Sequence, residues 1–216
     1  MMDNKTFWNE RYRNLPVLGS GPGSRAHSAW LKQRLLQSVI ADHGIRSILD
    51  IGCGDMFWLG EMSMDGIAYT GVDISDVIIA KNREKFPRFE FVQHDVAISP
   101  LGRTADLVVC LDVLIHQLRP ESFRAMLSNV LACMSSAGMI SYETPCPPPG
   151  IEPTDIPADV RSAENELRRF LNTSDFPRAQ TAFHGDLVGE VRKLMPQASI
   201  GVAGSYYNQT IYEVRI

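Results

Sequence analysis

A strand that runs directly into a Gly-x-Gly turn is the feature that most constrains the fold of this chain. Residues 48–55 read Ile-Leu-Asp-Ile-Gly-Cys-Gly-Asp, so that a short apolar run is stopped by Gly52 and Gly54. Glycines at such a turn let the backbone bend sharply and approach a ligand with no Cβ in the way. The motif predicts an α/β fold that binds a nucleotide-like ligand at the carboxyl end of its first strand.

The rest of the chain alternates short β-rich runs with longer helical stretches, which is typical of βαβ units. Strands are expected at residues 47–51, 68–73, 89–93, 106–111, 139–143, 199–202 and 209–216, and helices at 29–41, 76–86, 120–134 and 186–194. The last two strands flank residues 204–208, which suggests an antiparallel hairpin. We therefore expect a Rossmann-like sheet of seven strands, mostly parallel, with an antiparallel C-terminal hairpin and helices on both faces.

Composition limits the size and charge of this fold. Of the 216 residues, 44% are hydrophobic and 21% charged, so a single domain over residues 1–216 can bury a sizeable core. A formal net charge of −4 argues against capture of a nucleic acid, which needs a basic face, and no apolar run approaches the length of a membrane span. We expect a cytoplasmic protein that acts on a small molecule, with no nucleic acid or membrane partner. The sequence does not decide whether the chain forms a homo-oligomer.

Two segments fit the alternation poorly. Residues 19–24 form a Gly-rich stretch ahead of the first expected helix, and residues 145–178 form a long Pro-rich connection with a short helical piece around 163–171. Loops of this length in a compact domain are usually lids or binding loops. We interpret residues 145–178 as an insertion whose candidate role is that of a lid.

Asp50 separates two readings of the glycine turn. The dinucleotide fingerprint G-x-G-x-x-G would need a glycine where Phe57 stands, and Asp50 lies two residues before the first glycine. A carboxylate is unfavourable beside a pyrophosphate and favourable beside an ammonium group. The pattern therefore favours a ligand with a cationic group over a nicotinamide dinucleotide.

Four stretches together resemble a known family. Residues 50–54 are similar to the first motif of class I S-adenosylmethionine-dependent methyltransferases, although the third glycine of that motif is Met56 here. Residues 69–75, 91–96 and 106–116 resemble the second, third and fourth strand motifs in the same order. The resemblance implies that S-adenosylmethionine is the cofactor and S-adenosylhomocysteine the product.

The same resemblance implies a set of cofactor-binding residues. It places the Asp73 carboxylate on the ribose hydroxyls and the Asp95 carboxylate on the adenine amino group. The full set from the four motifs is Asp50, Gly52, Cys53, Gly54, Asp73, Ile74, Asp95, Val96 and Leu111. No metal is expected, and the four cysteines form no C-x-x-C pair that would indicate a zinc site or a disulfide framework.

The N-terminal residues 1–28 carry a narrower resemblance. Phe-Trp-Asn-Glu-Arg-Tyr-Arg at residues 7–13 is similar to a subgroup in which such an arm folds over the cofactor or substrate. Trp8 and Tyr12 can stack against a sulfonium by cation–π attraction. The other interpretation is that these two aromatic residues, four positions apart, form the buried stripe of a small amphipathic helix.

An acceptor hydroxyl or ammonium must lose a proton during methyl transfer, and His is a suitable base near neutral pH. His116 follows the fourth strand, where the resemblance places the acceptor pocket. It is the first candidate for a base, the alternative being a packed histidine that hydrogen-bonds a backbone carbonyl. Glu143, at the end of the fifth strand, is a second candidate, and His184 a third.

These features predict an enzyme that transfers a methyl group from S-adenosylmethionine to an oxygen or nitrogen atom of a small polar metabolite, a sugar being one such acceptor. One alternative is a non-catalytic protein that binds S-adenosylmethionine or a partner through its Pro-rich segment. The other is a nicotinamide-dependent oxidoreductase, against which Asp50 and Phe57 argue.

Overall fold

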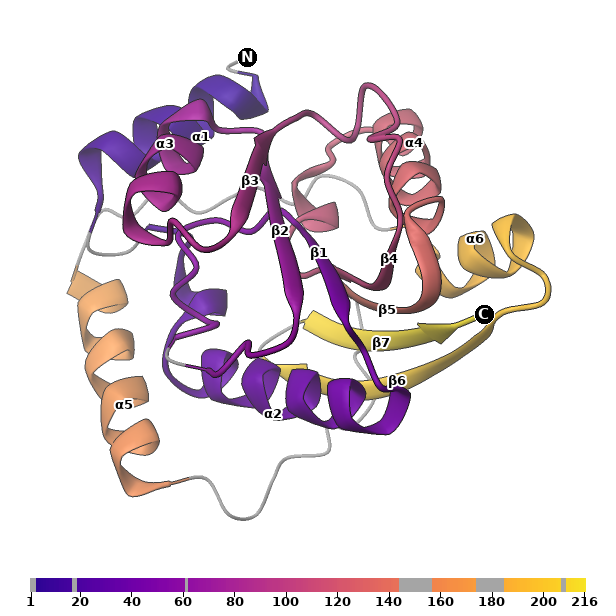
Figure 1. The fold of residues 1–216 in the computed structure, drawn as a ribbon. Helices are drawn as coiled ribbons and strands as arrows, with labels where there is room; N and C mark the ends of the chain where they lie inside the picture. Colours follow the sequence, from indigo (N-terminus) through magenta and orange to yellow (C-terminus); the bar gives the residue numbers. More distant parts are fainter. Residues whose placement is uncertain (1–2, 17–18, 61, 144–156, 174–184, 207–208) are drawn as a thin grey trace.

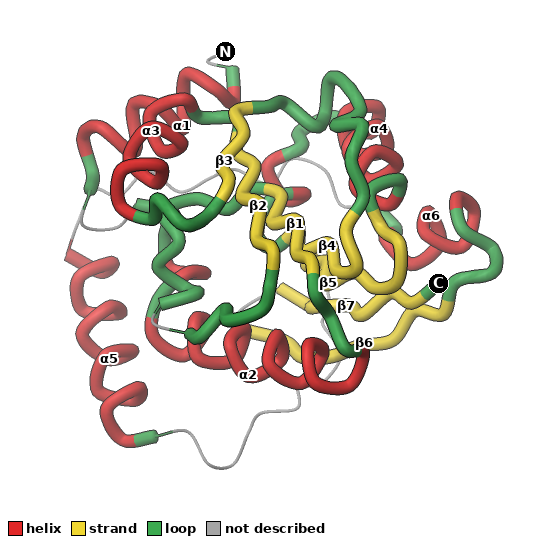
Figure 2. Tube along the Cα trace, viewed as in Figure 1, coloured by secondary structure: helices red, strands yellow, loops and turns green. Residues whose placement is uncertain are grey.

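A computed structural model describes residues 3–16, 19–60, 62–143, 157–173, 185–206 and 209–216, with the backbone alone for residues 170–173. Seven strands form one sheet in the order β3-β2-β1-β4-β5-β7-β6, which Figures 1 and 2 show edge to edge. The first five strands of this order form four parallel pairs, whereas β7 is antiparallel to both β5 and β6. The expected sheet and its reversed hairpin are confirmed.

Each strand is short and largely buried, as the apolar runs predict. Their bounds are β1 Ser47–Ile51, β2 Ala68–Asp73, β3 Glu90–Gln93, β4 Ala105–Cys110, β5 Met134–Glu143, β6 Ser199–Tyr206 and β7 Gln209–Arg215. β5 begins five residues earlier than expected, because its polar start still pairs with β4 through Met134 and Ala105. The expected turn at residues 204–208 is wrong: β6 continues to Tyr206, with a register shift between Val202 and Gly204.

Helices cover both faces of the sheet (Figure 1). Their bounds are α1 Asn4–Asn14, α2 Ala26–His43, α3 Asp76–Lys85, α4 Pro120–Leu131, α5 Ala158–Thr173 and α6 Leu187–Leu194, with short 3-10 turns η1 Pro22–Ser24 and η2 Leu114–His116. α2 buries its apolar stripe with Ile48, Leu107 and Met139 on one face. On the other face, side chains of α4 and α6 pack with Leu49 and Val108. Alternate residues of one strand thus serve two separate cores.

The helix ends differ from expectation where tertiary pairing competes with helical pattern. α2 starts at Ala26, three residues earlier than expected. α4 stops at Leu131, because Met134 already belongs to β5. α5 is longer than the piece expected around 163–171, and it contacts α2. Residues 144–156 and 174–184 of the Pro-rich segment lie outside the described residues, so its proposed role as a lid stays a prediction.

The N-terminal arm forms α1, whose first turn is capped by the Asp3 side chain accepting from the Thr6 N–H at 2.8 Å. α1 lies beside α3 (Figure 1). Two bonds hold it there: Asn9 donates to Asp76 at 2.8 Å and accepts from the Ser75 hydroxyl at 2.6 Å. The arm is therefore fixed over the carboxyl ends of the parallel strands.

Within the described part of the chain, no helix is both long and apolar enough to cross a bilayer. Cys53, Cys110 and Cys133 are buried free thiols, and Cys146 lies outside the described residues. Burial raises the pKa of the Cys53 thiol well above its ordinary value, with a further rise from the Asp73 charge. A protonated thiol of this kind packs as a small apolar group.

Candidate active site

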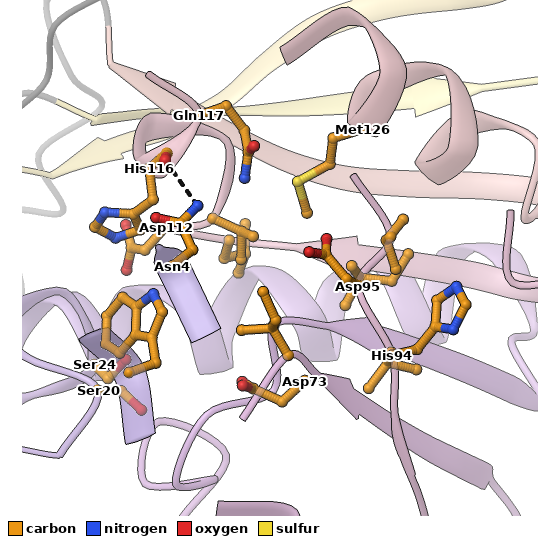
Figure 3. A pocket seen from close by; sticks show the side chains of 18 of the residues that line it. Asn4, Ser20, Ser24, Asp73, His94, Asp95, Asp112, His116, Gln117 and Met126 are labelled. Carbon is orange, nitrogen blue, oxygen red and sulfur yellow. Dashed lines mark hydrogen bonds between the residues drawn. The ribbon is translucent and has the colours of Figure 1, made fainter. Parts of the chain in front are cut away.

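A cavity of about 680 Å³, which includes its open mouth, lies at the carboxyl edge of β1, β2, β3 and β4 (Figure 3). The arm and the loops that follow these strands form its walls. Nine of the residues predicted to form the site line it: Trp8, Tyr12, Gly52, Asp73, Ile74, Asp95, Val96, Leu111 and His116. Asp50, Cys53, Gly54 and Glu143 do not line it.

The glycine turn after β1 needs glycine for two reasons. Gly52 and Gly54 have φ of +79° and +54°, in the left-handed region that side chains disfavour. A Cβ on Gly52 would also collide with the side chain of Val113, which lines the cavity. Met56, at the place of the third glycine of the motif, keeps a left-handed φ of +61° and buries its side chain. The backbone at position 56 thus keeps the left-handed conformation, although that conformation is strained for a methionine.

Asp73 ends β2 with its carboxylate in the cavity wall (Figure 3). One oxygen accepts from the Ser75 N–H at 2.9 Å and the other from the Gly54 N–H at 3.0 Å. Burial raises the pKa of Asp73 to about 6, although these backbone donors oppose the rise. Two bonds leave lone pairs on both oxygens, because a carboxylate offers about four acceptor positions.

Asp95 follows β3 and its carboxylate also faces the cavity (Figure 3). Its Oδ1 accepts from the Ala97 N–H at 3.0 Å, which fixes the orientation of the group. The neighbouring Val96 is buried and packs with the core on the α4 side. Asp73 and Asp95 therefore present two carboxylates along one wall.

Asp55 fastens the arm to the glycine turn, a role that sequence reasoning missed. Its carboxylate accepts from the Ser20 hydroxyl at 2.9 Å and from Arg25 Nη2 at 2.6 Å. The Arg25 guanidinium holds the pKa of Asp55 below its ordinary value, against the effect of burial. Arg11 donates from Nε to the Gly19 carbonyl at 2.8 Å. The Gly-rich residues 19–24 thus bridge the arm and the strand edge.

A buried ion pair below the cavity was also missed. Lys32 on α2 has a side chain only 1% exposed, and its Nζ lies 2.6 Å from the carboxylate of Asp112. The Tyr206 hydroxyl donates to the other oxygen of Asp112. Asp112 has a φ of +61° and lines the cavity. The sequence carries one signal of this ion pair. Lys32 interrupts an apolar helical stripe, and a charged side chain buried there needs a partner of opposite charge.

His116 ends η2 and lines the cavity opposite Asp73 and Asp95 (Figure 3). Loss of solvent lowers the pKa of His116 to about 4, while the Asp112 charge and a hydrogen bond to the Asp112 backbone act in the opposite direction. The Trp8 ring meets the imidazole edge to face at a centroid distance of 5.0 Å. The side chain is therefore an oriented, neutral imidazole at neutral pH.

Glu143, the second candidate for a base, does not line the cavity. Glu143 ends β5 in register with Gln209, at the edge of the antiparallel pair. His184 lies outside the described residues. Among the described residues, no group of three or more His, Cys, Asp or Glu side chains is placed to hold a metal ion.

Asp50 faces the core on the far side of β1 from the cavity. It is 2% exposed and accepts from the Tyr69 hydroxyl at 2.7 Å. Burial raises the pKa of Asp50 to about 7, although Tyr69 and the Lys32 charge lower it. The contact of Asp50 with a cationic ligand group therefore stays a prediction, and the position of Asp50 outside the cavity lining does not support it.

The chain resembles known methyltransferases in sequence. A family model described as a methyltransferase domain matches residues 48–138. A probable S-adenosylmethionine-dependent methyltransferase of Mycolicibacterium smegmatis is 24% identical over 190 residues, covering 82% of this chain and 72% of that protein. The mitochondrial ubiquinone biosynthesis O-methyltransferase of Schizosaccharomyces pombe is 35% identical over 85 residues, or 36% of this chain. The chain spans 31% of the length of this second relative.

The fold is shared with solved structures. Magnesium protoporphyrin IX methyltransferase of Synechocystis PCC 6803, crystallised with S-adenosylhomocysteine, superposes with a TM-score of 0.62 at 20% identity, covering 98% of this chain and 99% of the other. Its crystal structure with S-adenosylmethionine gives a TM-score of 0.61. Residues 48–138 therefore match a methyltransferase domain, and the chain as a whole is similar in fold to methyltransferases that bind S-adenosylmethionine.

Proposed function

We propose that this chain transfers a methyl group from S-adenosylmethionine to an oxygen or nitrogen atom of a small polar metabolite, with sugars among the candidate acceptors. The observation that carries the proposal is that one cavity holds Asp73 and Asp95 on one wall and His116 on another. Two carboxylates that could bind a nucleoside thus share one cavity with an imidazole that could accept a proton.

The cavity residues fit the cofactor. The Asp73 carboxylate has lone pairs left to accept from a ribose diol, and its backbone donors fix it in place. Glycine at position 52 lets Val113 pack directly against the backbone at the cavity wall, since a Cβ there would collide with the Val113 side chain. Asp95 would accept from an adenine amino group, and Trp8 and Tyr12 would cover the sulfonium side. When bound, S-adenosylmethionine supplies a methyl group that is already activated for displacement.

The residues around the acceptor then have to align it, exclude water and remove a proton. His116 is unprotonated at neutral pH because burial lowers its pKa to about 4. Its imidazole can accept the proton of an acceptor hydroxyl or ammonium. The Asp112 carboxylate, on the loop that also carries His116, favours the resulting imidazolium by its charge.

The arm supports a small acceptor. Asn4, Trp8 and Tyr12 of α1 wall the cavity, so the reacting atoms would lie beneath a helix and not on an open face. The relative from Schizosaccharomyces pombe is named as an O-methyltransferase, which favours oxygen as the acceptor atom.

The test is methyl release from S-adenosylmethionine labelled in its methyl group, with a panel of sugars, phenols and amines. Transfer of label to a panel member, abolished in a His116→Ala variant, is the expected result. Cofactor binding without transfer to any member would favour the non-catalytic alternative. Binding of a nicotinamide dinucleotide that excludes S-adenosylmethionine would favour the oxidoreductase.

A further inference from the structure

Gln117 directs toward the cavity a side-chain amide that no other described group hydrogen-bonds. It follows η2, is 8% exposed, and lines the cavity. Its backbone N–H donates to the Leu114 carbonyl at 3.0 Å, but its side chain makes no hydrogen bond with the described residues. Figure 3 shows the amide directed into the cavity, between His116 and Met126.

An amide that faces an open cavity hydrogen-bonds water there until a ligand displaces that water, and the ligand then has to supply the lost hydrogen bonds. Elsewhere the chain satisfies such a group: the amide of Gln33, on α2, donates to the Trp58 carbonyl at 2.8 Å. The amide is therefore suited to a partner that arrives with the ligand.

The charge of the surrounding wall limits what that partner can be. Asp73, Asp95 and Asp112 line the cavity, and none of its described lining residues is Lys or Arg. Lys32 lies behind Asp112, where it pairs with that carboxylate. A phosphate or carboxylate near Gln117 would thus meet acidic groups with no described cation in the wall, whereas an uncharged hydroxyl would meet none of that repulsion.

We propose that Gln117 is a specificity-determining residue, whose side-chain amide hydrogen-bonds an uncharged hydroxyl group of the methyl acceptor. Asn4 lines the same cavity, and its Nδ2 donates to the carbonyl of His116, the neighbour of Gln117, at 3.2 Å. A hydroxyl can donate to an amide oxygen and accept from an amide N–H. This inference rests on the proposed methyl transfer and adds the class of group that the acceptor presents.

The test compares Gln117→Met with the wild type. Methionine has nearly the shape of glutamine, so we expect the melting temperature of the free variant to stay within about 2 °C of the wild type, because an amide that is bonded to cavity water contributes little to stability. Cofactor affinity should be unchanged. Gln37→Met, at an exposed position of α2, is the matched control and should change neither property.

A thermal-shift assay of the protein loaded with S-adenosylhomocysteine then uses paired probes: glucose with glucose 6-phosphate, and catechol with 3,4-dihydroxybenzoate. We expect at least one neutral probe to stabilise the wild type more than its anionic partner, and its affinity to fall about tenfold in Gln117→Met. Preference for the anionic probes, no response to any neutral probe, or an unchanged affinity for the neutral probe in Gln117→Met would overturn the inference. Failure of methyl release with intact probe binding would instead overturn the proposed function alone.

Discussion

Ser20 and Asp55 hold each other by reciprocal hydrogen bonds. The Ser20 hydroxyl donates to the Asp55 carboxylate at 2.9 Å and accepts from the Asp55 backbone N–H, also at 2.9 Å. The Ser20 N–H donates to the same carboxylate at 3.2 Å. Because Ser20 belongs to the Gly-rich stretch and Asp55 to the turn after β1, this pair joins the arm to the strand edge that forms the cavity.

Replacement of Asp55 by Ala should release this joint. The buried Arg25 guanidinium would lose its partner, so we expect the free energy of unfolding to fall by about 2 kcal/mol and Tm by about 4–8 °C. Hydrogen exchange at residues 19–25 should accelerate, and cofactor affinity should weaken about tenfold if the arm covers the cofactor. Asp65→Ala is the control, because Asp65 is exposed and accepts from Ser63 at 2.7 Å. Unchanged exchange at residues 19–25 would contradict this role.

The buried carboxyl of Asp50 should make stability depend on pH. Its pKa of about 7 in the folded protein exceeds the ordinary value of 3.8, so the folded state binds more protons between these values. Its contribution to stability is therefore present at low pH and lost as pH rises through about 7. Asp50→Asn removes this loss, and the difference in Tm between variant and wild type should grow by about 5 °C from pH 5 to pH 8.

Asp106→Asn should change the pH dependence of stability in the opposite direction to Asp50→Asn. Asp106 accepts from the Arg46 and Ser47 N–H groups, and these bonds lower its pKa. Its contribution is present above the ordinary pKa and lost as pH falls, so its variant should be less stable at neutral pH than at low pH, relative to wild type. A constant difference between Asp50→Asn and wild type across this range would refute the assignment to Asp50. The cofactor affinity of Asp50→Asn also decides whether Asp50 acts on the ligand.

His116→Ala should retain cofactor affinity and lower turnover by about 10²–10⁴-fold, the usual contribution of a general base. Because the pKa of His116 is lowered to about 4, turnover should show no ionisation of this group near pH 6.5 and should fall only toward pH 4. The unfolded histidine takes up its proton near pH 6.5, so stability from this group is lost as pH falls below that value. His43→Ala, whose imidazole pairs with Glu213 away from the cavity, is the control. Unchanged turnover would remove His116 from the mechanism.

Most of the fold could be predicted because its signals are local. The apolar run of β4 and the glycine turn after β1 each need only neighbouring residues to be recognised. The start of β5 and the end of β6 could not be found in this way. Ser205 is held in β6 by pairing with Thr210 of β7, and the Ser135 hydroxyl of β5 donates to the Ala105 carbonyl of β4 at 2.9 Å. A local sequence pattern contains neither of these contacts.

The residues of the site likewise divide into those that local sequence signals reveal and those that only the structure reveals. Asp73 and Asp95 were found because they end strands, and parallel strands bring their carboxyl ends to one edge. Gln117 was missed because its significance is the absence of a partner, which only packing reveals. The joint between Ser20 and Asp55 was missed because 35 residues separate its members and neither residue type marks the other.

Calorimetric titration with S-adenosylmethionine tests the central claim most directly, because every assigned role depends on the cavity holding this cofactor. We expect one site per chain with a Kd below 1 mM, in the micromolar range common for cofactors. Asp73→Asn should weaken binding about tenfold, since a neutral amide accepts more weakly from a diol than a carboxylate does. Asp65→Ala should bind as the wild type does. Absence of binding at submillimolar S-adenosylmethionine by the folded wild-type chain would contradict the account.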